Sequence, residues 1–192
     1  MKSGRSVLFG VIAVVILAAF WFFGTKNMLV SLKEDVKTQR AQYESSLQRR
    51  SDLIPNLVST VKGYATHEKE VFTEIADARA KLAGSIESKD LNNMDEANDG
   101  LNSAIGRLLS ISENYPELTA SQQFIALQDE LAGTENRINT ARQYYNEKVN
   151  TYNTAIQSFP TSIVAEISGY YQLQYFEADD DAKEVPEVNF DE

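Results

Sequence analysis

Residues 7–23 near the N-terminus form an unbroken apolar run, VLFGVIAVVILAAFWFF, without a charged or strongly polar side chain. As a helix this run would be about 26 Å long, and Ser6 and Gly24 extend it to nearly the hydrocarbon thickness of a bilayer, roughly 30 Å. The run is apolar on every face, which is unlike the one-sided pattern of a helix in a soluble domain. The sequence therefore predicts one transmembrane helix over residues 7–24, preceded by a short basic tail at residues 1–6.

A cleaved signal peptide is the main alternative for this segment. The basic residues Lys2 and Arg5 fit both interpretations. However, the run is long for the apolar part of a signal peptide, and it ends in Phe20–Phe23 rather than in the small residues of a cleavage site. We therefore prefer a permanent, single-pass anchor.

The basic residues that flank the anchor are nearly balanced, which makes its orientation hard to assign. Lys2, Arg5 and the terminal amine lie on one side, and Lys26, Lys33 and Lys37 lie on the other. We expect an inner (cytoplasmic) membrane location with the rest of the chain outside the cytoplasm.

After the anchor, apolar residues recur every three or four positions, which is typical of an amphipathic helix. The stripe comprises Leu29, Leu32, Val36, Tyr43, Leu47, Ile54, Leu57, Val61, Tyr64, Val71, Ile75 and Leu82. Pro55 interrupts it, and Ser51 or Asp52 could cap a new helix just upstream. The stretch is either two helices meeting near residues 50–52 or one kinked helix, and we prefer two.

The remaining breaks divide the chain into helices of bundle length. Gly84-Ser85 ends the stripe, Asp90 could cap the next helix, and a turn is expected at residues 114–117. A helix over 124–156, expected to be the longest, stops at Phe159-Pro160, and residues 163–176 form a final helix or cover. No segment alternates with period two, so no sheet is expected.

The predicted fold is all-α, with an antiparallel up-and-down bundle of about four long helices over residues 25–176. A sustained coiled coil is the less favoured alternative, because Pro55, Gly84 and Pro116 interrupt the pattern.

The net charge of −10 is concentrated in an acidic C-terminal tail at residues 177–192, which holds eight acids and one base. The remainder is only mildly acidic and has no basic stripe, so we expect no nucleic-acid binding. The tail is expected to be mobile, or to act as a docking peptide through Pro186, Val188 and Phe190.

The side chains that most enzyme and metal sites need are scarce. There is no cysteine, and His67 is the only histidine, so the pattern of a zinc protease or a di-iron bundle is incomplete. We expect no catalytic residue, no cofactor and no metal site.

A dense polar cluster, Arg49, Arg50, Asp52 and Asn56, interrupts the apolar stripe. We expect it to form an inter-helix network with residues of the 124–156 helix and favour this structural role over a binding site. The expected partners are Glu135, Arg137, Arg142 or Asn146.

Three stretches closely resemble the LemA family. The most specific is Gln48–Ala83, QRRSDLIPNLVSTVKGYATHEKEVFTEIADARAKLA, and the others are Leu127–Tyr152 and Phe159–Phe190. One departure is Ser51, where many relatives carry histidine. The resemblance implies a membrane anchor, a helical bundle and candidate interaction or structural residues at Arg49, Arg50, Asp52, Pro55, Asn56, Lys62, Gly63, Tyr64, His67 and Glu68.

The family resemblance also implies a membrane-associated accessory protein whose molecular role is undefined. We therefore expect a non-enzymatic accessory or scaffold protein of the bacterial envelope. Its expected partner is a protein, such as a membrane protease or an envelope component. The alternative is an extracytoplasmic bundle that senses or binds a small ligand. Homo-oligomerisation is left open, since Gly10 and Ala13 offer only a weak small-residue face.

Overall fold

The computed structural model describes residues 2–65 and 67–176, with side chains from residue 8 onward. This part of the chain forms six helices and no strand: α1 (Lys2–Lys62), α2 (Lys69–Ser88), α3 (Leu91–Ser112), α4 (Pro116–Thr119), α5 (Gln122–Gln157) and α6 (Thr161–Ser168). The prediction of an all-α chain with an apolar N-terminal helix and a helical bundle is confirmed.

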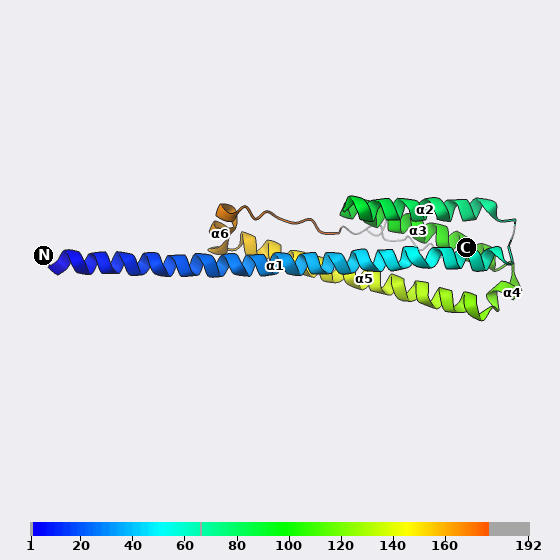
Figure 1. Ribbon diagram of the computed structural model, residues 1–192, viewed down its shortest axis with the longest axis horizontal. Helices are drawn as coiled ribbons and strands as arrows, with labels where there is room; N and C mark the ends of the chain where they lie inside the picture. The colour runs from blue at the N-terminus through cyan, green and yellow to red at the C-terminus, as the bar shows by residue number, and fades with distance from the viewer. Residues whose placement is uncertain (1, 66, 177–192) are drawn as a thin grey trace, which may run out of the picture.

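The bundle is built on an antiparallel pair, α1 and α5, against which the α2–α3 hairpin packs (Figure 1). The N-terminal part of α1 extends alone beyond the end of the bundle where α6 lies. By length and composition α1 is apolar enough to cross a membrane, and its most apolar stretch is not buried against the rest of the molecule.

The expectation of two helices meeting near residues 50–52 is wrong, because α1 runs without a break through Pro55. Proline cannot donate to the carbonyl four residues earlier, here that of Ser51. The Nε–H of Arg79, on α2, donates to this oxygen at 3.0 Å instead. A side chain from another helix thus satisfies the acceptor that Pro55 leaves open, and the helix continues.

The end of α2 also differs from the prediction. The helix continues through Gly84 to Ser88 and ends where Lys89 adopts a left-handed conformation, with φ 56°. Asp90 then caps α3 as expected, since its carboxylate accepts from the backbone N–H groups of Asn92 and Asn93. Glycine costs a helix only modestly, so the cap at Asp90 fixes the boundary more firmly than Gly84 does.

The predicted helix over residues 124–156 is present as α5, although α1 is longer. Residues 163–176 combine both expected forms. They begin within the short helix α6 and continue from Gly169 as an extended segment that returns along the bundle (Figure 1).

The core follows the predicted apolar stripe. Tyr43, Leu47, Leu57 and Val61 of α1 are completely buried, as are large side chains of α2, α3 and α5. Leu32 of the stripe is half-buried and packs against the core, whereas Tyr64, just beyond the end of α1, is 42% exposed.

Candidate functional site

A buried polar network is centred on Arg50, one of the four residues of the polar cluster noted in the sequence. This side chain is 5% exposed and pairs with Glu135 of α5. Its guanidinium also donates to the side-chain oxygens of Asn98, at 3.1 Å, and Asn102, both on α3. Arg50 therefore connects α1, α3 and α5 in one buried polar layer, and such a layer can fix the register of the three helices.

A second polar layer lies nearer the anchor and uses residues that the sequence did not single out as a group. The hydroxyl of Tyr43 donates to the Asp95 carboxylate at 3.1 Å, and Arg142 pairs with the same carboxylate. Burial and the charge of Asp95 raise the pKa of the Tyr43 phenol above its usual value, so the phenol stays protonated and remains a donor.

The extended segment after α6 is held by two asparagines of α5 that are seven residues apart. The Asn153 amide donates to the Leu173 carbonyl and accepts from the Leu173 N–H, both at 2.9 Å. Asn146 makes the same pair of bonds with Phe176, at 3.1 and 2.9 Å. Two helical turns and three extended residues both span about 10 Å. The spacing of Asn146 and Asn153 along α5 therefore equals the spacing of Phe176 and Leu173 along the segment.

Phe176, at the end of this segment, packs against residues of the second polar layer. Its ring lies 4.6 Å from that of Tyr43 and 4.9 Å from that of Tyr145, measured between centroids. The Arg142 guanidinium lies 5.9 Å from the Phe176 ring centroid. The extended segment is thus part of the bundle's packing up to residue 176.

Of the four partners expected for the polar cluster, Glu135 is the one that bonds to Arg50 within the described part of the chain. Arg142 and Asn146 belong instead to the second layer and the extended segment. Arg137 lines a surface groove of about 270 Å³ beside Gln42 and Tyr144. The signal that could have identified α3 as a partner is Asn98, which occupies a position of the Met94–Leu101 apolar stripe and is fully buried.

The other motif residues of α1 face outward. Arg49 forms an exposed ion pair with Glu130 at 2.5 Å, and Asp52 accepts from Gln48 at 2.9 Å. Arg49, Asp52 and Glu130 line a small surface groove of about 410 Å³. Pro55 and Asn56 are exposed one turn further along.

The remaining motif residues lie at the end of the bundle far from the anchor. Lys62, Gly63, Tyr64 and His67 are exposed around the α1–α2 turn. Lys62 Nζ lies 5.1 Å from the Phe72 ring centroid, and Glu68 accepts from the Tyr115 hydroxyl at 3.2 Å. The motif therefore contributes to the interior at Arg50, to one face of α1, and to this distal end.

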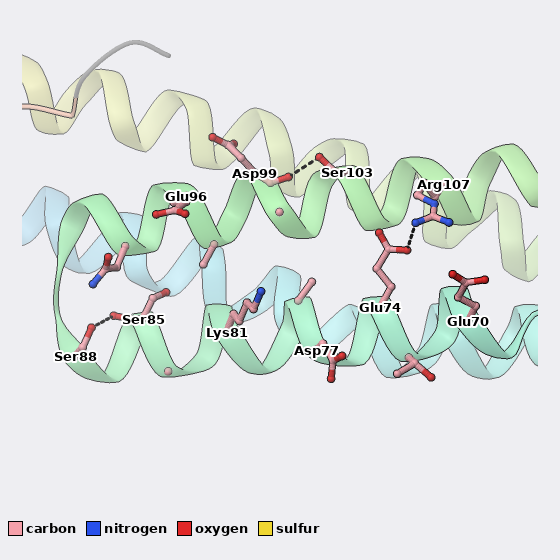
Figure 2. Close-up of a pocket in the computed structure, with 16 residues that line it drawn as sticks. Glu70, Glu74, Asp77, Lys81, Ser85, Ser88, Glu96, Asp99, Ser103 and Arg107 are labelled. Carbon is pink, nitrogen blue, oxygen red and sulfur yellow. Dashed lines mark hydrogen bonds and ion pairs between the residues drawn. The ribbon is translucent and has the colours of Figure 1, made fainter. Parts of the chain in front are cut away.

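A groove of about 1290 Å³ lies between α2 and α3. Figure 2 shows Glu74 and Arg107 facing each other across it, joined by an ion pair of 2.5 Å. Acidic and small side chains make up most of its lining. Sites for small organic ligands are mostly apolar, so this groove does not favour the small-ligand alternative.

The tail residues Pro186, Val188 and Phe190 lie outside the described residues. Within residues 2–65 and 67–176, no three metal-ligating side chains come together. The candidate site residues that the structure describes thus fall into three groups. One belongs to the buried layer around Arg50, one lies on the exposed face of α1, and one lies at the distal end of the bundle.

The sequence is similar to known proteins over most of its length. The LemA family model matches residues 39–190. Magnetosome protein MamQ 2 of Paramagnetospirillum magneticum is 28% identical, over 92% of this chain and 75% of that protein. Protein LemA of Metamycoplasma hominis is 25% identical, over 90% of this chain and 76% of that protein.

Proposed function

The chain belongs to the LemA family, and we propose that it is a non-enzymatic accessory protein that presents its bundle to a protein partner. In this proposal it is anchored once in the inner (cytoplasmic) membrane, and the bundle stands outside the cytoplasm. Residues 7–24 are the anchor, residues 25–176 the bundle, and residues 177–192 a separate acidic tail.

The continuity of α1 is the observation that carries this proposal. The same helix contains the apolar stretch and the core positions from Leu29 to Val61. Between Phe23 and Lys62 it rises about 58 Å. A chain anchored through this helix would therefore hold the α1–α2 turn well beyond the lipid headgroups, where an envelope protein can reach it.

The exposure of the motif at this distal end supports an interaction there. Tyr64 and His67 do not serve the core, since both are exposed in the turn between α1 and α2. Aromatic side chains presented on a turn at the end of a rigid helical support are common elements of protein interfaces.

Photo-crosslinking in intact membranes tests this function. Tyr64 is replaced by p-benzoylphenylalanine, and Tyr144, which is 52% exposed on the side of α5, serves as the matched control. We expect a discrete protein adduct at position 64, identified by mass spectrometry as one envelope protein, and little at position 144. Adducts with lipid alone at both positions would overturn the proposal. A protein adduct only at position 144 would show that the partner does not bind at the distal end of the bundle.

A further inference from the structure

The exposed side of α6 carries large apolar side chains. Ile163 and Ile167, one turn apart, are 46% and 69% exposed, and Phe159 in the preceding turn is 82% exposed. On the opposite face Val164 and Ala165 are buried against the bundle. One side of the helix thus covers the bundle, and large apolar side chains on the other side are left uncovered. Exposure of these side chains to water is unfavourable.

This face lies at the end of the bundle from which the anchor continues. α6 packs against both α1 and α5 and lies beside α1 where the single helix leaves the bundle (Figure 1). At this end of α1, Phe22 packs against the core, and Thr25 and Leu29 are buried. The apolar run of α1 ends at Phe23, so α6 lies at the level where α1 would leave the hydrocarbon.

We propose that α6 and the Phe159 turn form a second membrane contact, with Phe159, Ile163 and Ile167 inserted at the boundary between headgroups and acyl chains. This inference rests on the proposed anchoring through α1. An amphipathic helix beside a transmembrane helix is already held at the interface, so a weak apolar contact is sufficient. Two contacts limit the tilt and rotation of the bundle relative to the bilayer, which one helix alone leaves free.

The chemistry of the face points to apolar insertion rather than to attraction by anionic lipid. Glu166 is exposed on α6 between the two isoleucines in sequence. Its carboxylate would be repelled by an anionic surface. The contact should therefore form on zwitterionic phosphatidylcholine.

A fluorescent probe on single cysteines tests this contact in the full chain, which has no cysteine of its own. Ile163→Cys carries the probe on α6. Ile125→Cys is the matched control, since Ile125 is 45% exposed at the distal start of α5. Leu17→Cys places the probe within the apolar run. Each labelled protein is reconstituted in phosphatidylcholine vesicles containing doxyl-labelled phosphatidylcholine as a quencher.

We expect quenching at position 163 to be severalfold stronger than at position 125 and to approach that at position 17. Quenching at 17 with none at 163 would overturn the second contact and leave the anchor intact. Absence of quenching at 17 would overturn both the anchor and this inference. Equal quenching at 163 and 125 would also overturn it, because the contact would then not be confined to the anchor end.

Discussion

Arg50 carries a positive charge into the interior at the point where α1, α3 and α5 meet. Such a charge is tolerated because Glu135 compensates it and two asparagine oxygens accept from it. Its Nε–H and the amide nitrogen of Asn98 have no hydrogen-bond partner within the described residues. We infer that this layer contributes more to the register of the helices than an apolar layer would.

Truncation of Arg50 should therefore be costly. Arg50→Ala removes the cation paired with Glu135 and the donor to two asparagine oxygens, and we expect a loss of about 3 kcal/mol in the free energy of unfolding. Urea denaturation of the full chain in detergent micelles, followed by circular dichroism, measures this loss.

The neighbouring residue supplies the control. Arg49 pairs with Glu130 on the surface, with 59% of its side chain exposed. Arg49→Ala should therefore cost less than about 1 kcal/mol. Similar losses for the two alanine variants would contradict the structural role assigned to Arg50.

At the scale of elements, the course of α1 shows where local sequence rules failed. Pro55 and the nearby Ser51 and Asp52 have the pattern of a helix start. The acceptor that Pro55 leaves open is satisfied by Arg79, 28 residues away in sequence. A pattern within a few residues of Pro55 cannot reveal a hydrogen bond from Arg79. The sequence therefore predicted a helix break near residues 50–52, although α1 is continuous.

The hydrogen bond from Arg79 should matter only while residue 55 is proline. Arg79→Met removes the donor to the Ser51 carbonyl, and we expect it to reduce the free energy of unfolding by about 1 kcal/mol. In a Pro55→Ala background the new N–H of residue 55 can donate to Ser51, so the same substitution should cost much less. A double-mutant cycle on urea unfolding measures this coupling, and an equal cost in both backgrounds would argue against it.

The extended segment at residues 170–176 depends on side chains of α5 rather than on its own helix or strand. Asn153→Ala removes both bonds to Leu173, and the segment should then open without loss of the helices. We expect faster chymotryptic cleavage after Tyr171 and Tyr175 with little change in circular dichroism. Asn150→Ala is the control, since Asn150 only accepts one exposed bond from Tyr175 at 3.4 Å. Equal cleavage of the two variants would show that Asn153 does not hold the segment.

Across the whole molecule, the sequence predicted the apolar N-terminal helix from its unbroken apolar run, and the core stripe and the long helix α5 from their periodicity. For the polar cluster around Arg50 it offered four partners on α5, and Glu135 is the one of them that pairs with Arg50. It did not predict the partners on α3, the asparagine contacts to residues 173 and 176, or the position of α6 beside α1. These depend on how the helices pack, and short segments such as α6 carry too few residues to show a period.

In the proposed topology the chain crosses a membrane once and holds its bundle on the outer side. Two single cysteines test both parts in one labelling experiment on intact cells, or on spheroplasts where an outer membrane blocks the reagent. Ser88→Cys lies at the exposed end of α2, and Ser3→Cys lies before the apolar run. A membrane-impermeant maleimide should label position 88 without lysis and position 3 only after lysis. Labelling of 88 only after lysis would contradict the outward orientation, and identical behaviour of the two positions would contradict a single membrane crossing.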